Sequence, residues 1–431
     1  MKVEDSMISR EWRNTFASTV KFKYPKNKVH MHKLWKLTSF DIFCLGMNIK
    51  SAWIYREAPD FEKMKSALET LATMYPHLSG HYDEKEKSVV WDDSAKPQLP
   101  FDTLDLRKYG IAELSGNARL AWSLVKPYDV KGFKKGLVPA FSATLGYLKD
   151  GCILYVQCAH ATMDGHTFHA LINQWAAIYR GEDTSAMVVD QSLVPSEEAY
   201  SKEETLRLVR EKGWPTIGFR KVIKMLVSLV RNNSIKKTTV MEVSQDWISS
   251  LKAESGAGTN AVLSAIVVGK MAERLPEKKS FKMLFTTDLR ERINGIGDDF
   301  FDNLSQPAVI EGEVPADIGI ASIAATIDKG LKEALEPDTL EGNMQLYMCS
   351  SHYGLPYVHF DASDMNCPGN GTIIINNFLK FRANALDWGL GIPLYSFTNE
   401  LPDMVKLWQP VAGGPVQIIF GGYAAKMMAK G

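Results

Sequence analysis

Apolar and polar residues alternate between strand-like and helix-like periods along the first 180 positions. Residues 152–158 form a short apolar and aromatic run, which is typical of a buried strand. From 165 onward, apolar residues recur at helical spacing and predict a helix with one buried face, ended by Gly181. These positions are Phe168, Leu171, Ile172, Trp175, Ile178 and Tyr179. His160 therefore stands where a strand leaves the core, a common place for a catalytic side chain.

The same periodicities predict elements in other parts of the chain. Residues 34–57 are expected to form strands around a turn, and 61–75 a helix closed by Pro76. Residues 79–93 are expected to form a hairpin with a charged tip. The second half predicts a helix at 259–275, a strand and polar turn at 281–293, a turn and strand at 369–381, and a strand that breaks into a helix at 413–428.

The charge pattern between these halves suggests a connecting segment. Residues 182–204 hold seven acidic residues and one basic residue, and we interpret them as a surface crossover. Residues 212–237 hold seven basic residues, no acidic ones, and apolar residues at helical spacing. This basic helix could bind a membrane surface, or it could be a linker helix that packs on the body with its basic face in solvent. A third alternative is that its lysines lie near the phosphates of a ligand. We therefore expect an N-terminal domain at 1–181, a crossover at 182–237 and a C-terminal domain at 238–431.

Composition narrows the class of protein. A chain of 431 residues favours two domains, and 45% apolar with 23% charged residues is ordinary for a globular protein. Because 50 basic residues balance 50 acidic ones, a nucleic-acid partner is not expected. No apolar run is long enough to span a membrane, and we expect no signal peptide. The five cysteines are scattered without a CxxC pair, so we expect no metal, no disulfide framework and a cytoplasmic location.

His160 begins the pattern HxxxDG, which continues to Asp164 and Gly165. An imidazole with its usual pKa of about 6.5 is available as a base near neutral pH. The chain has no GxSxG motif, so a serine hydrolase would lack its nucleophile. Asp164 lies at a turn, where aspartate commonly holds backbone groups or an arginine. The residues thus favour His160 as a lone base with Asp164 as a structural brace, while a hydrogen-bonded core histidine remains the alternative.

Several segments in order resemble the BAHD acyl-CoA-dependent acyltransferases, within the chloramphenicol acetyltransferase-like superfamily. The resemblance covers nearly the whole chain. HATMDG matches the family's HxxxDG, and DWGLG stands where the family has DFGWG. The other matching segments are KLTSFD at 36–41, the helix and turn at 53–82, TNAVLSA at 259–265, TTDLRERI at 286–293 and FFDN at 300–303, the last in place of the family's YFGN.

The sequence departs from the family pattern in three places. Trp388 and Leu390 replace a phenylalanine and a tryptophan in the DFGWG motif, which is mainly structural. Asn377 and Phe378 stand where the family has a serine and a tryptophan ahead of that motif. Ala159 precedes His160, whereas condensation domains and wax-ester synthases usually have two adjacent histidines. This last departure favours the BAHD interpretation over those relatives.

The resemblance implies an α/β fold of two chloramphenicol acetyltransferase-like domains, with mixed sheets flanked by helices and a channel between them. Acyl-CoA, the co-substrate, would enter from one face and a small-molecule alcohol or amine from the other. His160 would deprotonate the acceptor, with no covalent intermediate, metal or bound cofactor. We expect a monomeric enzyme of secondary metabolism. The alternatives are a condensation-domain-like enzyme that uses carrier-bound substrates and a non-catalytic binding protein.

The resemblance also assigns expected roles to individual residues. Asn376 shares a strand face with Phe378 and is our candidate donor to the oxyanion or acceptor. Because residues 355–371 contain no Lys or Arg, an anionic acceptor is not expected. Asp361 and Asp364 are expected to be surface aspartates in a turn, and the alternative is that they meet an amine. The expected structural residues are Asp164, Gly165, Arg290, Asn303, Asp387, Gly389 and Gly391. Because a buried carboxylate needs a partner, we expect Asp164 to pair with Arg290. The expected substrate-binding residues are Thr38, Phe40, Met163, Phe378, Thr259, Ser264, Lys236 and Lys237, with a plain helix cap as the alternative at Thr259.

Overall fold

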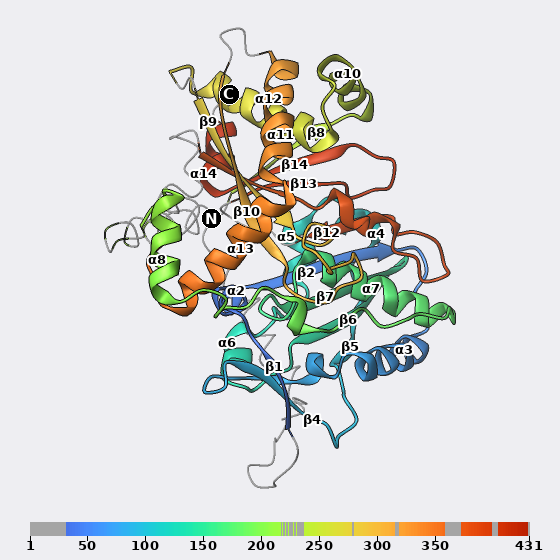
Figure 1. The fold of residues 1–431 in the computed structure, drawn as a ribbon. Coiled ribbons are helices and arrows are strands. Elements are labelled where there is room, and N and C mark those ends of the chain that lie inside the picture. Colours follow the sequence, from blue (N-terminus) through green and yellow to red (C-terminus); the bar gives the residue numbers. More distant parts are fainter. Residues whose placement is uncertain are drawn as a thin grey trace.

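The computed structural model describes residues 32–216, 218, 220, 223, 227, 230, 237–277, 280–314, 319–357, 372–398 and 404–429. Lys236, most of the predicted basic helix, and the loop that carries Asp361 and Asp364 lie outside the described residues. Two units, each built on a sheet with helices, lie one above the other in Figure 1.

The lower unit is centred on a five-stranded sheet in the order β12-β2-β7-β6-β5 (Figure 1). Its strands are β12 Tyr395–Thr398, β2 Asn48–Tyr55, β7 Cys152–Ala159, β6 Phe141–Leu148 and β5 Phe101–Leu106. Every residue of β7 is buried, because alternate side chains enter apolar clusters on the two sides of the sheet. This explains why the strand is a continuous apolar run in the sequence.

Helices α3, Phe61–Met74, and α7, Gly165–Arg180, pack together beside this sheet. The indole N–H of Trp175 on α7 donates to the carbonyl of Met64 on α3, at 2.8 Å. Gly181 ends α7 in the left-handed conformation, as the sequence predicts. The smaller elements are the three-stranded sheet β1 His32–Lys36, β4 Ser88–Asp92 and β3 His81–Asp83, the helices α4 Ile111–Leu114, α5 Ala118–Ser123 and α6 Val130–Lys134, and the 3₁₀ turn η1 Pro76–Ser79.

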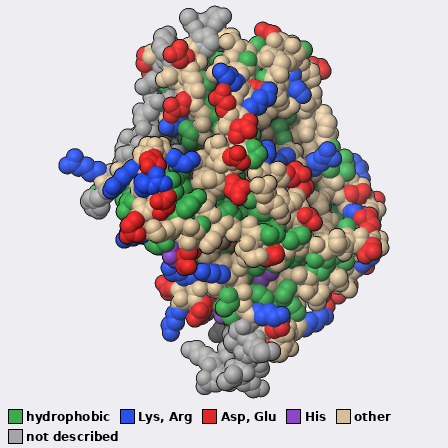
Figure 2. Space-filling model, in the orientation of Figure 1, with side chains coloured by type: hydrophobic (Ala, Val, Ile, Leu, Met, Phe, Trp, Pro, Cys, Tyr) green, Lys and Arg blue, Asp and Glu red, His purple; other side chains and the backbone are tan. Residues whose placement is uncertain are grey.

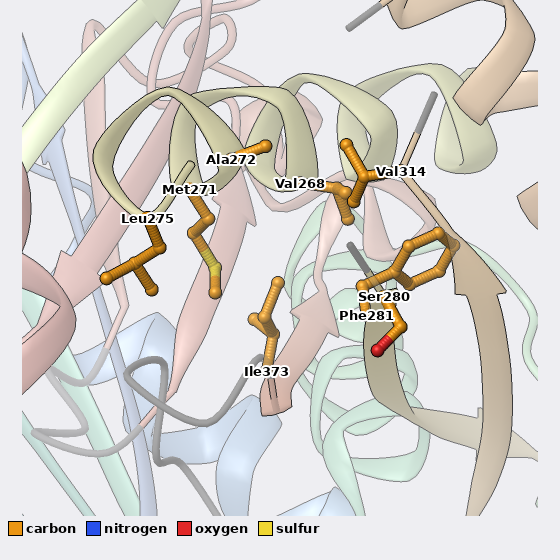
Figure 3. Close-up of a pocket in the computed structure, with 8 residues that line it drawn as sticks. All are labelled: Val268, Met271, Ala272, Leu275, Ser280, Phe281, Val314 and Ile373. Atoms are coloured by element: carbon orange, nitrogen blue, oxygen red, sulfur yellow. The ribbon is translucent and has the colours of Figure 1, made fainter. Parts of the chain in front are cut away.

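The upper unit contains a six-stranded mixed sheet in the order β10-β9-β11-β13-β14-β8. Its strands are β10 Ser305–Glu313, β9 Ser280–Asp288, β11 Thr372–Asn377, β13 Val405–Trp408, β14 Val416–Gly421 and β8 Thr238–Val243. Its helices are α10 Gln245–Ser255, α11 Thr259–Arg274, α12 Ile320–Ala334 and α14 Gly422–Met428. Helix α11 packs closely on the sheet, and the gap of about 10 Å³ between Val268, Phe281 and Ile373 is too small for a substrate (Figure 3).

The crossover between the units is more ordered than its polar sequence predicts. It contains the turn η2, Gln191–Leu193, and the helix α8, Lys202–Glu211, which packs on α13, Pro337–His352. The amide of Gln191 pairs with both backbone groups of Lys36, so the crossover is attached to β1. Figure 2 shows acidic and basic side chains interspersed over one face of both units.

The prediction of only strands and a turn at 34–57 is wrong in one respect. Residues Ser39–Cys44 form a short helix, α2, between β1 and β2. Thr38 caps this helix, because its hydroxyl accepts from the backbone N–H of Asp41 while the Asp41 carboxylate accepts from the backbone N–H of Thr38. This reciprocal capping box outweighs the strand-like apolar run that follows it.

The chain returns to the lower unit near its end. Strand β12 lies within the predicted second domain, yet it pairs antiparallel with β2 of the first. The turns η5, Leu379–Phe381, and η6, Ala383–Ala385, lead to it. The indole of Trp53 donates to the carbonyl of Ala383, and the hydroxyl of Tyr55 donates to that of Leu386. The domain boundaries at 181 and 238 remain a prediction. The segment that contains β12 belongs to the predicted second domain by sequence but packs on the lower unit.

Candidate active site

His160 directly follows β7, and both its backbone groups are bonded. Its N–H donates to the carbonyl of Met47, at 3.1 Å, and its carbonyl accepts from the side-chain amide of Asn303, at 2.9 Å. Met47 precedes β2 and Asn303 precedes β10, so the lower and upper units each hold one side of this residue. The backbone of His160 is thus held by residues of both units.

Burial lowers the pKa of His160, and this effect is larger than the opposing influence of the Asp164 charge and of nearby backbone groups. The imidazole is therefore neutral at neutral pH, which is the form that accepts a proton. Its Nδ1 atom is buried and has no hydrogen-bond partner of good geometry among the described residues. The residue as a whole is partly exposed, which leaves Nε2 as the accessible nitrogen.

Asp164 caps the N-terminus of α7, and both its carboxylate oxygens are occupied. Oδ1 accepts from the backbone N–H of Thr167, at 2.9 Å. Oδ2 accepts from the guanidinium of Arg290, at 2.8 Å, and from the backbone N–H of Leu304, at 2.9 Å. The predicted pair of Asp164 with Arg290 is therefore present. The partners of the two carboxylate oxygens are Thr167, Arg290 and Leu304, and the His160 ring is not among them.

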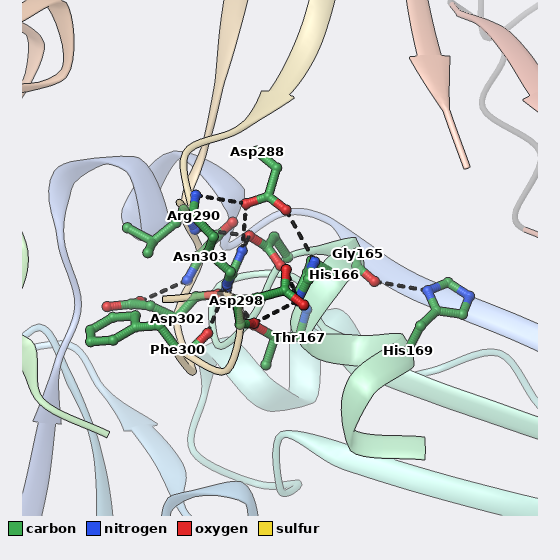
Figure 4. Close-up of polar contacts among 12 residues, drawn as sticks. Gly165, His166, Thr167, His169, Asp288, Arg290, Asp298, Phe300, Asp302 and Asn303 are labelled. Carbon is green, nitrogen blue, oxygen red and sulfur yellow. Dashed lines mark hydrogen bonds and ion pairs between the residues drawn. The ribbon is translucent and has the colours of Figure 1, made fainter. Parts of the chain in front are cut away.

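Arg290 lies at the centre of the contacts between the two units (Figure 4). Its side chain is 1% exposed, and its five N–H groups meet five acceptors. The acceptors are the Phe300 carbonyl, the Asp164 and Asp288 carboxylates, the Thr167 hydroxyl and the Asp302 carbonyl. A buried guanidinium is stable only with such complete pairing.

A second ionic group lies beside this arginine. The carboxylate of Asp288 accepts from Arg290, from Nδ1 of His166 at 3.1 Å, and from the ammonium of Lys380. Burial alone would raise the pKa of Asp288, but His166 and the two cations hold it well below its usual range. Lys380 belongs to η5, so this group attaches the segment after β11 to the start of α7.

Gly165 of the HxxxDG motif lies against the aromatic ring of Phe381. A Cβ atom at this position would lie 3.0 Å from the ring, closer than ordinary contacts allow. The same ring stacks on His169, with centroids 5.0 Å apart. A larger residue at 165 would therefore require the Phe381 ring to shift.

The two asparagines at the end of β11 lie on opposite faces of the upper sheet. Asn377 donates from its amide to the side chain of Asn260 on α11, at 3.1 Å, and so faces the helices of the upper unit. Asn376 pairs in register with Lys406 of β13, on the opposite face of the sheet. The ammonium of Lys406 lies 5.7 Å from the ring centroid of Phe378. Phe378 follows the end of β11 and has helical backbone angles, so the face that it shares with Asn376 stays a prediction.

The other predicted substrate-binding residues have diverse environments. Thr38 caps α2, Phe40 is partly exposed and stacks on Phe43, and Met163 is fully buried. Thr259 is the first residue of α11 and follows the cap residue, Gly258, so the capping alternative at Thr259 is wrong. Ser264 is buried within α11, and Lys237 is exposed beside β8. Among the described residues, no hydrogen bond joins Thr259, Ser264 or Lys237 to His160.

A cavity of about 340 Å³ with both polar and apolar lining residues opens beside the start of α2. Thr38 lines it together with residues of the crossover and Met348 of α13. Glu197, also in its wall, accepts from the backbone N–H and the hydroxyl of Ser39. The cavity thus adjoins a residue that the sequence predicts to bind substrate.

The DWGLG segment lies at the far end of α7 from His160. The carboxylate of Asp387 accepts from the backbone N–H groups of Gly389 and Gly391, at 2.7 and 3.0 Å. Both glycines have positive φ, which a side chain would strain. The buried ring of Trp388 meets Trp175 edge-on, with centroids 5.0 Å apart. These contacts agree with a structural role for the motif.

Sequence reasoning missed three polar residues near the predicted site. His166 and Asp302 both belong to the contacts around Arg290, and Lys406 is 1% exposed within the upper sheet. His166 follows the HxxxDG motif directly, and Asp302 stands at the glycine position of the family's YFGN, so both positions could have been noticed. Lys406 lies in an alternating strand and gives no signal.

The part of the chain that the structure describes contains no group of three His, Cys, Asp or Glu residues arranged for a metal. Within the same residues, no helix is long and apolar enough to cross a bilayer.

Solved structures with the same architecture include acyltransferases. The TRI101 protein of F. sporotrichioides, in complex with coenzyme A and T-2, matches with a TM-score of 0.70 over 93% of this chain and 97% of that one, at 16% identity. Vinorine synthase matches with a TM-score of 0.63, over 94% of this chain and 93% of that one, at 15% identity. The fold is therefore the two-domain chloramphenicol acetyltransferase-like fold.

The architecture is shared more widely. The first condensation domain of the CDA synthetase matches with a TM-score of 0.58, over 92% of this chain and 97% of that one, at 12% identity. No curated protein sequence matches the chain. The family model named Transferase family matches residues 117–404, which is more than half of the chain. The chain belongs to this family, the BAHD acyltransferases.

Proposed function

We propose that the protein transfers an acyl group from acyl-CoA to a hydroxyl or amine of a small-molecule acceptor, with His160 as general base. The observation that carries this proposal is that both carboxylate oxygens of Asp164 already accept hydrogen bonds. They accept from the Arg290 guanidinium and from the backbone N–H groups of Thr167 and Leu304, so we assign Asp164 a structural role. His160 is then a lone, neutral proton acceptor at the junction of the two units.

The reaction needs only this base and the two substrates. Nε2 of His160 takes the proton of the acceptor's O–H or N–H as the acceptor oxygen or nitrogen attacks the thioester carbonyl. The tetrahedral oxyanion then collapses, the carbon–sulfur bond breaks, and the CoA thiolate leaves and takes the proton back from the imidazolium. A positioned base of this kind contributes about 10²–10⁴ in rate. No acyl-enzyme forms.

Asn376 is the proposed donor to the oxyanion or to the acceptor. Support comes from its position on β11, on the face opposite to the one on which Asn377 is bonded to Asn260. Phe378 itself has no N–H or O–H on its side chain to offer. A single preorganised donor is worth about 10²–10³ in rate.

The proposed substrates follow from the ligands in structurally similar proteins and from the residues that line the cavity beside Thr38. TRI101 structures of F. graminearum contain coenzyme A with deoxynivalenol or with T-2 mycotoxin, which supports a small-molecule acceptor. We place acyl-CoA against the upper unit near Thr259, with Lys236 or Lys237 toward its 3′-phosphate. The cavity beside Thr38 is the proposed acceptor side. Glu197 and Glu198 in its wall outnumber Lys36, which disfavours an anionic acceptor.

The test is incubation with a panel of acyl-CoAs and alcohols or amines, with detection of the released CoA thiol and mass spectrometry of the product. We expect acceptor-dependent CoA release, reduced about 10²–10⁴-fold in His160→Ala at an unchanged melting temperature. Equal turnover by a folded His160→Ala would refute the base assignment. Equal inhibition by CoA and dephospho-CoA would remove the lysine contact with the 3′-phosphate.

A second candidate is condensation with carrier-bound substrates, favoured by the structural match to a condensation domain. Offering the same acyl group as a thioester of CoA and of a phosphopantetheinylated carrier separates the two functions. Preference for the carrier would establish the second candidate. Saturable ligand binding without any CoA release would establish a binding protein on this fold.

A further inference from the structure

A second histidine, His169, is buried on α7 one turn after Gly165 of the HxxxDG motif. The residue is 3% exposed and belongs to the buried side of the helix. A polar ring in such surroundings is stable only when its nitrogens have hydrogen-bond partners. Nδ1 lies 2.8 Å from the carbonyl oxygen of Gly165 (Figure 4), and Nε2 lies 3.4 Å from the hydroxyl oxygen of Ser51 on β2. Both ring nitrogens are therefore partnered.

These contacts determine which nitrogen carries the proton. A carbonyl oxygen only accepts, so Nδ1–H donates to Gly165. Nε2 is then the acceptor, and the Ser51 hydroxyl donates to it. Burial lowers the pKa of His169 to about 4, against the opposing Gly165 carbonyl, and the charge of His166 lowers it further. The ring is therefore neutral at neutral pH, and two elements of the lower unit fix its orientation.

The face of this ring supports the segment that follows β11. Phe381 of η5 stacks on His169, with ring centroids 5.0 Å apart and 12° between the planes. Phe381 also meets the ring of Phe378 edge-on, with centroids 5.7 Å apart. Phe378 directly follows β11. A continuous series of contacts thus leads from Gly165 through His169 and Phe381 to the end of β11.

This series joins the two segments that carry the predicted catalytic groups. His160 lies just before Gly165 in the chain, and Asn376 lies at the end of β11. The first belongs to the lower unit and the second to the upper unit. A base and an oxyanion donor act on the same substrate only when their separation is held closely, and a misplacement of about 1 Å can cost about 10² in rate.

We propose that His169 is a positioning residue whose ring, through the stack on Phe381, sets the separation between the His160 segment and the end of β11. Its effect on turnover rests on the proposed function, whereas the orientation of the ring and its influence on His160 do not. Because both nitrogens are bonded, rotation of the ring is opposed and η5 meets a fixed flat surface. Without the ring, the ion pair of Lys380 with Asp288 would keep η5 attached, so we expect a shift of η5 relative to α7 and not unfolding.

The test is a double-mutant cycle on the stack, with kcat and KM measured at a temperature at which every variant is folded. His169→Asn removes the stack but keeps an amide that can donate to the Gly165 carbonyl, as the Asn173 amide donates to the His169 carbonyl one turn later, at 2.9 Å. Phe381→Leu removes the stack from the other side. We expect kcat to fall about 10²-fold in each variant, with KM for acyl-CoA changed less than about twofold. Because both variants remove one contact, the double variant should lose no more than the worse single variant.

Phe61→Leu is the matched control, because the ring of Phe61 packs on Phe101 within the lower unit, with centroids 4.7 Å apart. It should leave the kcat of the wild-type protein and of His169→Asn unchanged. A merely structural histidine would lower the melting temperature without lowering kcat in the folded variant. Unchanged kcat in His169→Asn, or losses that multiply in the double variant, would overturn positioning.

Nitrogen NMR of the full chain labelled with ¹⁵N-histidine gives a readout that does not need turnover. Wild-type His169 should show the Nδ1–H tautomer and no titration between about pH 8 and pH 6. The Nε2–H tautomer, or a titration in this range, would overturn the assigned orientation whether or not the variants fold. The His160 signals should shift in Phe381→Leu and not in Phe61→Leu. If no acyl-CoA is turned over, the proposed function fails, whereas unshifted His160 signals in Phe381→Leu would overturn the positioning itself.

Discussion

The Asp164→Asn substitution tests the interpretation of Asp164 as a brace. Asparagine keeps one carbonyl oxygen, which can still cap α7 through the Thr167 N–H. In that orientation, its NH₂ group replaces Oδ2 and faces the N–H groups of Arg290 and Leu304 at 2.8 and 2.9 Å. Donors then face donors, and one of the two negative charges beside Arg290 is lost.

The magnitude can be worked out from these contacts. Removing one partner of a buried ion pair costs about 3–5 kcal/mol. Because Asp288 still lies 2.9 Å from the guanidinium, we expect the lower end, about 3 kcal/mol. An unfolding entropy of about 2.1 cal/mol/K per residue gives about 0.9 kcal/mol/K for the 431 residues. The melting temperature should therefore fall by about 3 °C.

The assay is thermal unfolding at pH 7, alongside Asp60→Asn as the matched control. Asp60 caps α3 through a bond of 2.8 Å from the Lys63 N–H, but it is exposed and has no ion pair with any residue that the structure describes. Asparagine caps as well as aspartate, so Asp60→Asn should change stability by less than about 0.5 kcal/mol. Equal melting temperatures for the two variants would refute the brace. Lost activity at full stability, with a displaced acid limb in the pH profile, would instead indicate that Asp164 acts on the His160 ring.

Three other predictions concern the site. The acid limb of kcat/KM should have an apparent pKa below 6.5, because burial lowers the pKa of His160, and a limb above 6.5 would contradict this. Asn376→Ala should lose about 10²–10³ in kcat while Asn377→Ala retains most of it, and the reverse ranking would show that the wrong face was chosen. Gly165→Ala should cost about 1–3 kcal/mol of unfolding free energy through the contact of its Cβ with Phe381, and calorimetry should show partial recovery in Gly165→Ala with Phe381→Leu.

The sequence allowed the elements around His160 to be predicted because their signals are local. A buried strand at 152–158, a helix from 165 and its end at Gly181 follow from periodicity and turn chemistry within about 30 residues. The pairing of Asp164 with Arg290 spans 126 residues and came from the order of motifs that resemble a family, since periodicity carries no information about such contacts.

Other features depend on contacts that no single segment reveals. The helix α2 was hidden in an apolar run because its start is set by a reciprocal cap between Thr38 and Asp41. Lys406 gives the pattern of an exposed strand residue, yet it is buried because both sides of β13 are covered. The catalytic roles of His160 and Asn376 remain predictions.

Strand β12 comes from the second half of the chain but completes the five-stranded sheet of the lower unit. The two halves therefore depend on each other in expression and evolution. Strand β12 covers the edge of β2, an eight-residue strand with the apolar residues Ala52, Trp53 and Ile54. A fragment that ended before residue 238 would leave this edge open to pairing with other chains, which favours aggregation. Separately expressed halves should therefore be insoluble alone and recover only when refolded together, and gene fusions that exchange the second half must keep the β12 segment compatible with the first.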